Sequence, residues 1–306
     1  MGTCLTESDA AGLLTWTRTI DRALVHRDAI AEVLLTDVIQ LGETEFVIAA
    51  QWPRSHRVYR PDTDGRHDPM LILETVRQAG LALSHIGFSV GADQQSVMHN
   101  VGFTLNPDTE PRALHSATNL TIGVHCRNVV YRGPSLRSMT VELRFVADGQ
   151  KFAIGTGMIS WLSRRTYTAL RARAGARITD PEQPVTNLRP VAASPLRAAD
   201  DSLIANQPDG SDSRRLLVVP VHHPVYFDHP LDHAPGMMLI DAAWQAVAAM
   251  RGDGARLVQC LMQCPSFTEL GLTTSIELAA TSSDTTQFSV EQAGRQTASG
   301  TLRVWR

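Results

Sequence analysis

The sequence predicts an α+β protein in which one folding unit occurs twice. The chain resembles itself at a fixed offset of 167 residues, which is the distance from Glu74 to Asp241. Each copy carries one long apolar helix pattern, and alternating strand patterns follow that helix in both copies. The 306 residues suffice for two such units, each with its own hydrophobic core.

The duplication is clearest where residues 56–82 are aligned with residues 223–249. This ungapped alignment holds seven identical pairs, whereas chance would give roughly one or two. The pairs are His56/His223, Val58/Val225, Tyr59/Tyr226, Met70/Met237, Gln78/Gln245, Ala79/Ala246 and Ala82/Ala249. Similarity of this kind at a constant offset indicates that one unit has been duplicated.

Copy one begins with residues 1–22, where we expect a short helix or partial disorder. Two β-rich stretches follow and precede the helix. They lie at 32–41 and 45–52, and the strands after the helix are expected at 96–105, 120–131, 139–146 and 152–161. These four segments alternate apolar and polar residues, which is typical of strands with one buried face.

One long helix is expected in each copy. Asp68-Pro69 supplies an N-cap followed by proline at the first helical position, and Gly87 can end the helix. In copy two the helix is expected to start at Pro235 and to end at Gly252 or Gly254. Both helices are apolar on nearly every face, so each must be buried. A single buried helix wrapped by an antiparallel sheet is the hot-dog arrangement, and the sequence therefore predicts a double hot-dog.

Copy two has a β-rich entry at 214–221 before its helix. Its strands are expected at 257–267, 274–280, 286–292 and 297–305. The stretch between the copies has no strand pattern, and its Pro-rich second half predicts a linker, while its first half can form a short surface helix. The predicted organisation is an N-terminal segment at 1–22, repeat one at 23–162, a linker at 163–196 and repeat two at 197–306.

The composition excludes several classes of protein. A net charge of -3 leaves no basic surplus for nucleic acid or for an acidic membrane surface. An apolar run of about 18 residues, which a membrane helix requires, does not occur. The four cysteines are scattered, as in free thiols of a reducing cytoplasm. We therefore predict a cytoplasmic protein. Nucleophile-elbow, phosphate-loop and dinucleotide motifs are missing, so we predict no cofactor.

Chemistry is most strongly indicated at Glu74, Arg77 and Gln78, which share one face of the first apolar helix. A buried carboxylate is costly unless it is paired or protonated, so we expect a raised pKa at Glu74, as a general base or acid needs. The alternative is a buried ion pair between Glu74 and Arg77 that only locks the helix. The recurrence of an acid and a glutamine at Asp241 and Gln245 favours a functional site.

A polar loop precedes the second helix. It holds His222, His223, Asp228, His229, Asp232 and His233. We predict no metal site there, because Pro224 and Pro230 exclude helical ligand spacing and the loop matches no known ligand pattern. Packing of the loop and a catalytic or substrate-orienting role both stay open for its histidines.

The motifs of both copies resemble the A-factor-synthase family of γ-butyrolactone autoregulator enzymes. The resemblance is carried by VHR at 25–27, WPRSH at 52–56, HDPMLILETVRQAG at 67–80 and FDHPLDHAPGMMLIDAA at 227–243. The last motif also resembles the stretch that opens the central helix of hot-dog acyl-thioester dehydratases.

The resemblance implies an acyltransferase. Such an enzyme joins a β-ketoacyl thioester, carried by acyl carrier protein or coenzyme A, to the hydroxyl of dihydroxyacetone phosphate on the way to a butenolide signal. Other thioester chemistry on the same fold, dehydration or hydrolysis, is one alternative, and a non-catalytic regulator that binds an acyl lactone is another. A monomer and a homodimer are both compatible with the sequence.

By this resemblance, the acid of helix one corresponds to Glu74, with Arg77 and Gln78 beside it. The acid of helix two corresponds to Asp241, but Trp244 stands where the family usually has a basic residue. The second site is therefore expected to lack a cation, and one working site is expected where the helix of one unit meets the loop of the other.

Roles follow for the residues of that working site. We expect Glu74 to act as general base on the attacking hydroxyl and Arg77 to hold the phosphate or the developing negative charge. Gln78 and His229 would orient the substrate. Backbone N–H groups near Met237 and Met238 would receive the thioester oxyanion. The remaining predicted substrate-binding residues are His223, Asp241 and Gln245.

Overall fold

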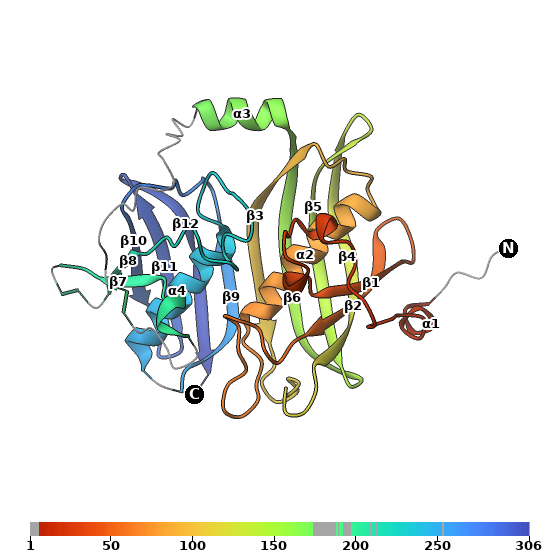
Figure 1. Cartoon of the computed structure of the whole chain (residues 1–306), viewed down its shortest axis with the longest axis horizontal. Coiled ribbons are helices and arrows are strands. Elements are labelled where there is room, and N and C mark those ends of the chain that lie inside the picture. The colour runs from red at the N-terminus through yellow and green to blue at the C-terminus, as the bar shows by residue number, and fades with distance from the viewer. Residues whose placement is uncertain are drawn as a thin grey trace. The chain divides into compact units, whose positions relative to one another are not determined.

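The computed structural model describes residues 6–173, 188, 190–191, 197–208, 210–211, 213–252 and 254–305. The chain divides into two compact units. Unit 1 comprises Met1–His56 and Pro61–Leu170, and unit 2 comprises Arg57–Arg60 and Arg171–Arg306. Each unit has one long helix and an antiparallel sheet (Figure 1).

Unit 1 places its sheet strands in the order β1-β2-β4-β5-β6-β3. Before the sheet come α1 (Glu7–Ala11) and two single-turn helices (Arg22–Val25 and Ile30–Glu32). The other elements are β1 (Leu35–Gln40), β2 (Glu45–Trp52), α2 (Met70–Ile86), β3 (Gln94–Leu105), β4 (Thr118–Arg132), β5 (Ser135–Ala147) and β6 (Gln150–Ser163), and the boundary between the units falls within α3 (Arg164–Arg173). All the strands predicted for copy one are therefore confirmed.

Unit 2 orders its strands β9-β12-β11-β10-β8-β7. A single-turn helix (Ala199–Asp201) leads into β7 (Ile204–Asn206) and β8 (Arg214–Leu217), followed by α4 (Gly236–Arg251), β9 (Arg256–Gln263), β10 (Thr274–Ala280), β11 (Thr285–Gln292) and β12 (Arg295–Trp305). The three-residue strand β7 was not predicted, because it is too short to show any alternation of apolar and polar residues.

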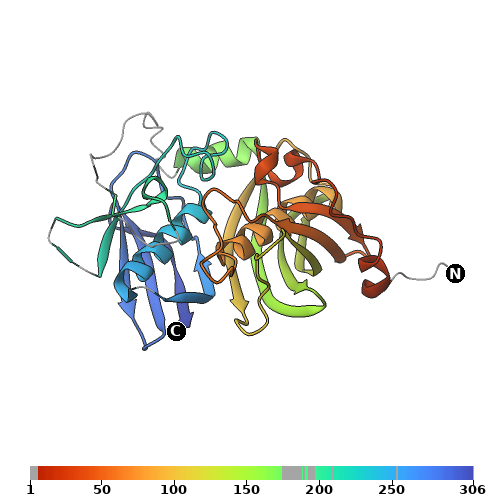
Figure 2. The ribbon, with the colours of Figure 1, turned by 60° about the horizontal axis from the view of Figure 1, so that its bottom comes forward.

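The central helices are buried, as their all-round apolar sequence predicted. Fourteen of the 17 residues of α2 are buried, and Figure 2 shows α2 and α4 each lying across one face of the sheet of its own unit. Close approach of α2 to β6 depends on Gly155, since a Cβ there would stand 2.4 Å from Cγ2 of Val76. Each unit thus has the central helix packed against an antiparallel sheet that the predicted double hot-dog requires.

Helix α2 begins one residue later than predicted. Its N-cap is Pro69 rather than Asp68. The carboxylate of Asp68 still accepts a hydrogen bond from the backbone N of Met70 at 2.9 Å, so it satisfies a first-turn donor from one residue further out. The predicted end at Gly87 is confirmed, and Gly252 is the C-cap of α4.

The segments predicted outside the repeats are described only in part. Thr6 and Asp9 form a capping box on α1, so the N-terminal segment contains the expected short helix, while residues 1–5 lie outside the described residues. The first half of the expected linker contains α3, and most of its Pro-rich second half is outside the described residues.

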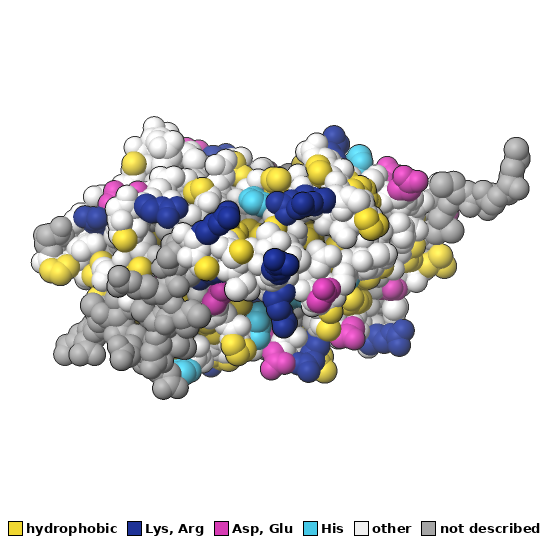
Figure 3. Space-filling model, turned by 90° about the horizontal axis from the view of Figure 1, so that it is seen from above, with side chains coloured by type: hydrophobic (Ala, Val, Ile, Leu, Met, Phe, Trp, Pro, Cys, Tyr) yellow, Lys and Arg dark blue, Asp and Glu magenta, His cyan; other side chains and the backbone are white. Residues whose placement is uncertain are grey.

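The surface agrees with the small net charge of the sequence. On the face that Figure 3 shows, basic side chains lie among acidic and hydrophobic ones. Among the helices that the structure describes, none has the length and apolar character needed to cross a membrane.

Candidate functional site

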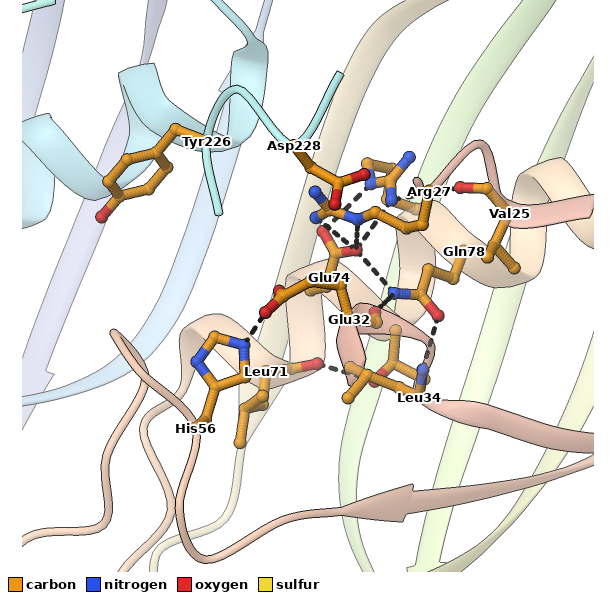
Figure 4. A network of polar contacts seen from close by, with 12 residues as sticks. Val25, Arg27, Glu32, Leu34, His56, Leu71, Glu74, Gln78, Tyr226 and Asp228 are labelled. Carbon is orange, nitrogen blue, oxygen red and sulfur yellow. Dashed lines mark hydrogen bonds and ion pairs between the residues drawn. The ribbon is translucent and has the colours of Figure 1, made fainter. Parts of the chain in front are cut away.

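The polar residues of α2 gather around one buried carboxylate. Glu74 is 2% exposed and Gln78 is 0% exposed, so the predicted burial of Glu74 is confirmed. The Arg77 side chain keeps 20% of its surface exposed. Figure 4 shows that Arg27, which follows the single-turn helix Arg22–Val25, points toward the same carboxylate.

The two oxygens of Glu74 are bound unequally. Oε1 accepts hydrogen bonds from Nη2 of Arg27 at 2.8 Å, from Nη2 of Arg77 at 2.8 Å and from Nε2 of Gln78 at 2.7 Å. Nε of Arg27 also lies 3.2 Å from Oε1. Oε2 accepts only from Nε of Arg77, at 3.0 Å, within the described part of the chain. Arg77 therefore grips both oxygens, whereas Arg27 grips one.

The expectation of a raised pKa at Glu74 was wrong. Burial alone favours the neutral carboxyl group and raises its pKa. The positive charges of Arg27 and Arg77, with hydrogen bonds from Arg77 and Gln78, outweigh burial and hold the pKa of Glu74 well below its ordinary value of 4.5. The group is ionised at neutral pH. This is the geometry of the alternative, a buried ion pair, with two arginines rather than one.

Gln78 ties α2 to the segment before β1. Its Oε1 accepts from the backbone N of Leu34 at 2.9 Å, and its Nε2 donates to the backbone O of Glu32 at 2.7 Å. His56 extends this network, since its Nε2 lies 3.3 Å from the carboxylate of Glu32. Because its amide is engaged by the protein, the geometry favours Gln78 as a residue that positions Glu74, and a direct contact with substrate stays a prediction.

Unit 2 surrounds Asp241 with different partners. Nη2 of Arg197 lies 2.8 Å from its Oδ1, and the hydroxyl of Tyr226 donates to its Oδ2. The expectation that the second acid lacks a cation was therefore wrong. The cation comes from a position 44 residues before Asp241 rather than from three residues after it, where Trp244 stands.

The rest of the network repeats in unit 2. Gln245 accepts from the backbone N of Leu203 at 2.8 Å and donates to the backbone O of Asp201 at 3.2 Å. Nε2 of His223 lies 3.0 Å from the carboxylate of Asp201. The glutamine, the histidine and the acid that it meets thus play the same parts as Gln78, His56 and Glu32 in unit 1. In both units, the glutamine of the central helix thus holds that helix to the segment before the first strand.

The two acids differ in their access to solvent. Around Asp241, which is fully buried, Arg197 keeps 1% of its side chain exposed and Trp244 is 3% exposed. Around Glu74, Arg77 reaches the surface with a fifth of its side chain. A substrate can therefore meet a cation directly in unit 1, while the acid of unit 2 is enclosed by its partners.

The histidine-rich loop of unit 2 contributes one buried and several more accessible histidines. The His229 side chain is 37% exposed, and its Nδ1 lies 3.5 Å from a carboxylate oxygen of Asp228. His233 pairs with Asp232 at 2.6 Å. His223 is buried against Asp201 and so belongs to the repeated network. The expected contact of His229 with the site of Glu74 stays a prediction.

The predicted oxyanion donors are placed at the start of α4. The backbone N of Met238 donates to the carbonyl O of Pro235 at 2.9 Å, so this N–H is already used. The backbone N of Met237 donates to no acceptor among the described residues. Of the two positions, Met237 is the better donor for a ligand.

The three described cysteines, Cys126, Cys260 and Cys264, are free, and their thiols are buried or partly buried. Burial raises the pKa of Cys126 and of Cys264 to about 12 and raises that of Cys260 well above the ordinary value, so these thiols stay protonated at neutral pH. In the part of the chain that is described, no group of three or more His, Cys, Asp or Glu side chains could hold a metal ion.

Sequence reasoning missed several members of both clusters. Arg27 and Arg197 are the main ones, with Glu32, Tyr226 and Asp201 behind them. The motif VHR at 25–27 singled out Arg27 without giving it a role. Arg197 carried no signal, since a single arginine after a Pro-rich stretch has no pattern.

A known protein family and several known enzymes are similar to this chain in sequence. A family model described as the A-factor biosynthesis hotdog domain matches residues 8–163 and 200–305. The chain is 36% identical over 236 residues to a 2-oxo-3-(phosphooxy)propyl 3-oxoalkanoate synthase of Streptomyces virginiae, covering 76% of this chain and 78% of the relative. It is 29% identical over 246 residues to a protein of the same name from Streptomyces coelicolor, with 80% and 76% covered.

Solved structures with a similar fold are more distant in sequence. An acyl-ACP thioesterase from Bacteroides thetaiotaomicron matches with a TM-score of 0.55 at 13% identity, over 85% of this chain and 98% of that one. The 12:0-ACP thioesterase from Umbellularia californica matches with a TM-score of 0.55 at 9% identity, over 87% and 99%. At such identities they support the fold alone, and with the matched hotdog domain they confirm the predicted double hot-dog.

Proposed function

Because this chain belongs to the A-factor biosynthesis hotdog family, we propose that it is an acyltransferase acting on dihydroxyacetone phosphate. The observation that carries the proposal is its 36% identity, over three quarters of its length, to a 2-oxo-3-(phosphooxy)propyl 3-oxoalkanoate synthase. That name describes an ester between a 3-oxoalkanoate and a propyl group that bears a ketone and a phosphate.

The proposed reaction forms one C–O bond and breaks one C–S bond. The primary hydroxyl of dihydroxyacetone phosphate attacks the carbonyl carbon of a β-ketoacyl thioester. The hydroxyl proton passes to a base, the tetrahedral intermediate collapses, and the departing thiolate takes that proton back as a thiol. The products are the β-ketoacyl ester and the free thiol. We expect acyl carrier protein or coenzyme A to carry the thioester, in the cytoplasm.

The phosphate of the acceptor has a suitable partner in Arg77. Two arginines, Arg27 and Arg77, each lie 2.8 Å from Oε1 of Glu74. The guanidinium of Arg77 is the more exposed of the two, and its planar fork suits a phosphate. A thioesterase, which uses water as acceptor, would have no comparable use for this cation.

Glu74 is the proposed base, because it is the carboxylate that stands beside Arg77. The backbone N of Met237 is the proposed donor to the thioester oxyanion, since the first turn of a helix offers unpaired N–H groups. His229 is proposed to orient the substrate, and Gln78 to position the base. These roles need an acceptor hydroxyl within about 3 Å of the Glu74 carboxylate.

The direct test supplies purified protein with a β-ketoacyl-N-acetylcysteamine thioester, with and without dihydroxyacetone phosphate, and follows thiol release and ester by mass spectrometry. We expect ester only when the phosphate is present. Glu74→Gln should lower the rate by about 100-fold or more, as expected for removal of a general base.

A matched control is Glu277→Gln, which removes an exposed acid from a surface pair with Arg214 and should leave the rate unchanged. Free β-keto acid independent of the acceptor would identify a hydrolase, and an enoyl product would identify a dehydratase. Full activity in Glu74→Gln would place the base elsewhere, and no turnover with thioester and acceptor would favour a non-catalytic regulator.

A further inference from the structure

Two arginines around one carboxylate suggest that the acceptor itself switches the base on. We infer that the phosphate of the acceptor draws Arg77 away from Glu74 and so frees Oε2 as the base, while Arg27 is the positioning residue that keeps the carboxylate in place. This inference rests on the proposed function, and it assigns a part to Arg27 that no motif predicted.

The unequal binding of the two oxygens is the first argument. Oε2 of Glu74 depends on Nε of Arg77 alone among the described residues, at 3.0 Å. If the guanidinium of Arg77 turns toward a phosphate, Oε2 loses its one donor. Oε1 still accepts from Arg27 at 2.8 Å and from Gln78 at 2.7 Å. One oxygen is thereby released and the other stays anchored, which fixes the direction in which the base points.

The environments of the two arginines are the second argument. The Arg27 side chain is 8% exposed, whereas that of Arg77 is 20% exposed. The backbone N of Arg27 is held by the carbonyl O of Arg22 at 3.1 Å, directly after a tight turn in which His26 has a left-handed backbone (φ 50). Arg77 is thus the guanidinium that can meet an anion, and Arg27 is the one that stays.

The consequence is a base that works only when the acceptor is bound. With both arginines in place, the Glu74 carboxylate is a weak base, because its pKa is held well below the ordinary value. Loss of the Arg77 charge raises that pKa, so Oε2 can take the hydroxyl proton and later return it to the thiolate. Without an acceptor the thioester is protected, because water meets no competent base.

Unit 2 provides the contrast within the same chain. Its acid is held on one oxygen by Arg197, 1% exposed, and on the other by the Tyr226 hydroxyl. Trp244 occupies the position that corresponds to Arg77. The uncharged indole of Trp244 cannot turn toward a phosphate as the guanidinium of Arg77 can. Unit 2 therefore has a buried arginine that corresponds to Arg27, but at this position it lacks the arginine that responds to phosphate.

The test separates the acceptor into two pieces. Transfer from the β-ketoacyl-N-acetylcysteamine thioester to dihydroxyacetone is measured with and without added phosphite dianion, which can occupy the phosphate position. We expect phosphite to accelerate ester formation by at least about tenfold, since binding energy from a non-reacting group is used at the reacting centre. The Arg77→Met and Arg77→Lys variants should show much less activation, and the wild-type measurement needs no variant to fold.

Arg27 is tested through the pH dependence of the rate with dihydroxyacetone phosphate. The charged side chains that contact Glu74 within unit 1 are Arg27 and Arg77, and Glu32 with His56 lies one hydrogen bond further away. Arg27→Met should move the acid limb of the kcat profile to higher pH. Arg27→Lys keeps the positive charge and should return the limb most of the way to its wild-type position. A purely structural role would lower the yield of folded protein and leave the limb where it was.

The outcomes are distinguishable. Ester from dihydroxyacetone phosphate, with no phosphite activation of dihydroxyacetone and an unmoved acid limb in Arg27→Met, overturns the switch and leaves the proposed function standing. Absence of ester from dihydroxyacetone phosphate in the wild type removes the proposed function, and the switch with it. Phosphite activation that is lost in Arg77→Met supports both.

Discussion

Substitution of Asp241 tests whether the second acid holds unit 2 together or handles substrate. Asp241 is fully buried, and its partner Arg197 is 1% exposed. In Asp241→Asn the side chain keeps its shape and loses its charge, so the buried guanidinium of Arg197 loses the negative charge of this partner. The Tyr226 hydroxyl also faces an amide in place of a carboxylate. We expect a large loss of stability in unit 2 and little direct effect on chemistry.

The size of the loss follows from the burial of the pair. Breaking a buried ion pair by removing one partner costs about 3–5 kcal/mol, because the remaining charge is uncompensated. Replacing both partners, as in Arg197→Met with Asp241→Leu, removes that charge as well. The double variant should therefore be less destabilised than the sum of the single ones, with a coupling energy of about 1–3 kcal/mol.

Hydrogen exchange is the suitable assay, since a chain of two units need not unfold in one step. Protection of the amides in β9–β12 reports the stability of unit 2, and protection of α2 reports that of unit 1. Ester formation per folded molecule is measured on the same samples. Glu277→Gln is the control, because its ion pair with Arg214 is about half exposed and worth little.

Two results would refute this reasoning. A change in the stability of unit 2 below about 1 kcal/mol would mean that the pair is not the buried anchor its exposure indicates. Unchanged protection together with loss of ester formation would make Asp241 a participant in the reaction. In that case the substrate-binding role expected from the sequence would hold.

Two further predictions concern unit 1. The pKa of Glu74 is lowered on folding, so its charge stabilises unit 1 above pH 4.5, its ordinary pKa, and this contribution fades as pH falls toward the depressed value. The thermal midpoint of Glu74→Gln should therefore lie well below wild type at pH 7 and closer to it at pH 3, and a gap that does not narrow would contradict the pairing. In Gly155→Ala the new Cβ meets Val76 at 2.4 Å, which should cost about 1–3 kcal/mol in urea unfolding. Gly42→Ala, where the nearest atom is 3.9 Å away, is the control, and equal stability of the two variants would disprove the close approach.

Patterns in the sequence were sufficient to predict the two repeated α+β units. The repeat at an offset of 167 residues, the proline starts and the glycine ends predicted α2 and α4 to within one residue at their first turns. Alternation of apolar and polar residues predicted the longer strands, because each strand buries one face against its helix. Burial of Glu74 also followed from sequence, since nearly every face of that helix is apolar.

Tertiary structure alone decided the electrostatics of both acids. Arg27 lies 47 positions before Glu74, and Arg197 lies 44 positions before Asp241, so neither pairing is visible in the spacing of residues on a helix. Periodicity shows which side chains leave water, and this led to the expectation of a raised pKa for Glu74. The sign of a pKa shift depends on which charges the fold brings within a few ångströms, because Coulomb interactions inside a protein are strong only at short range.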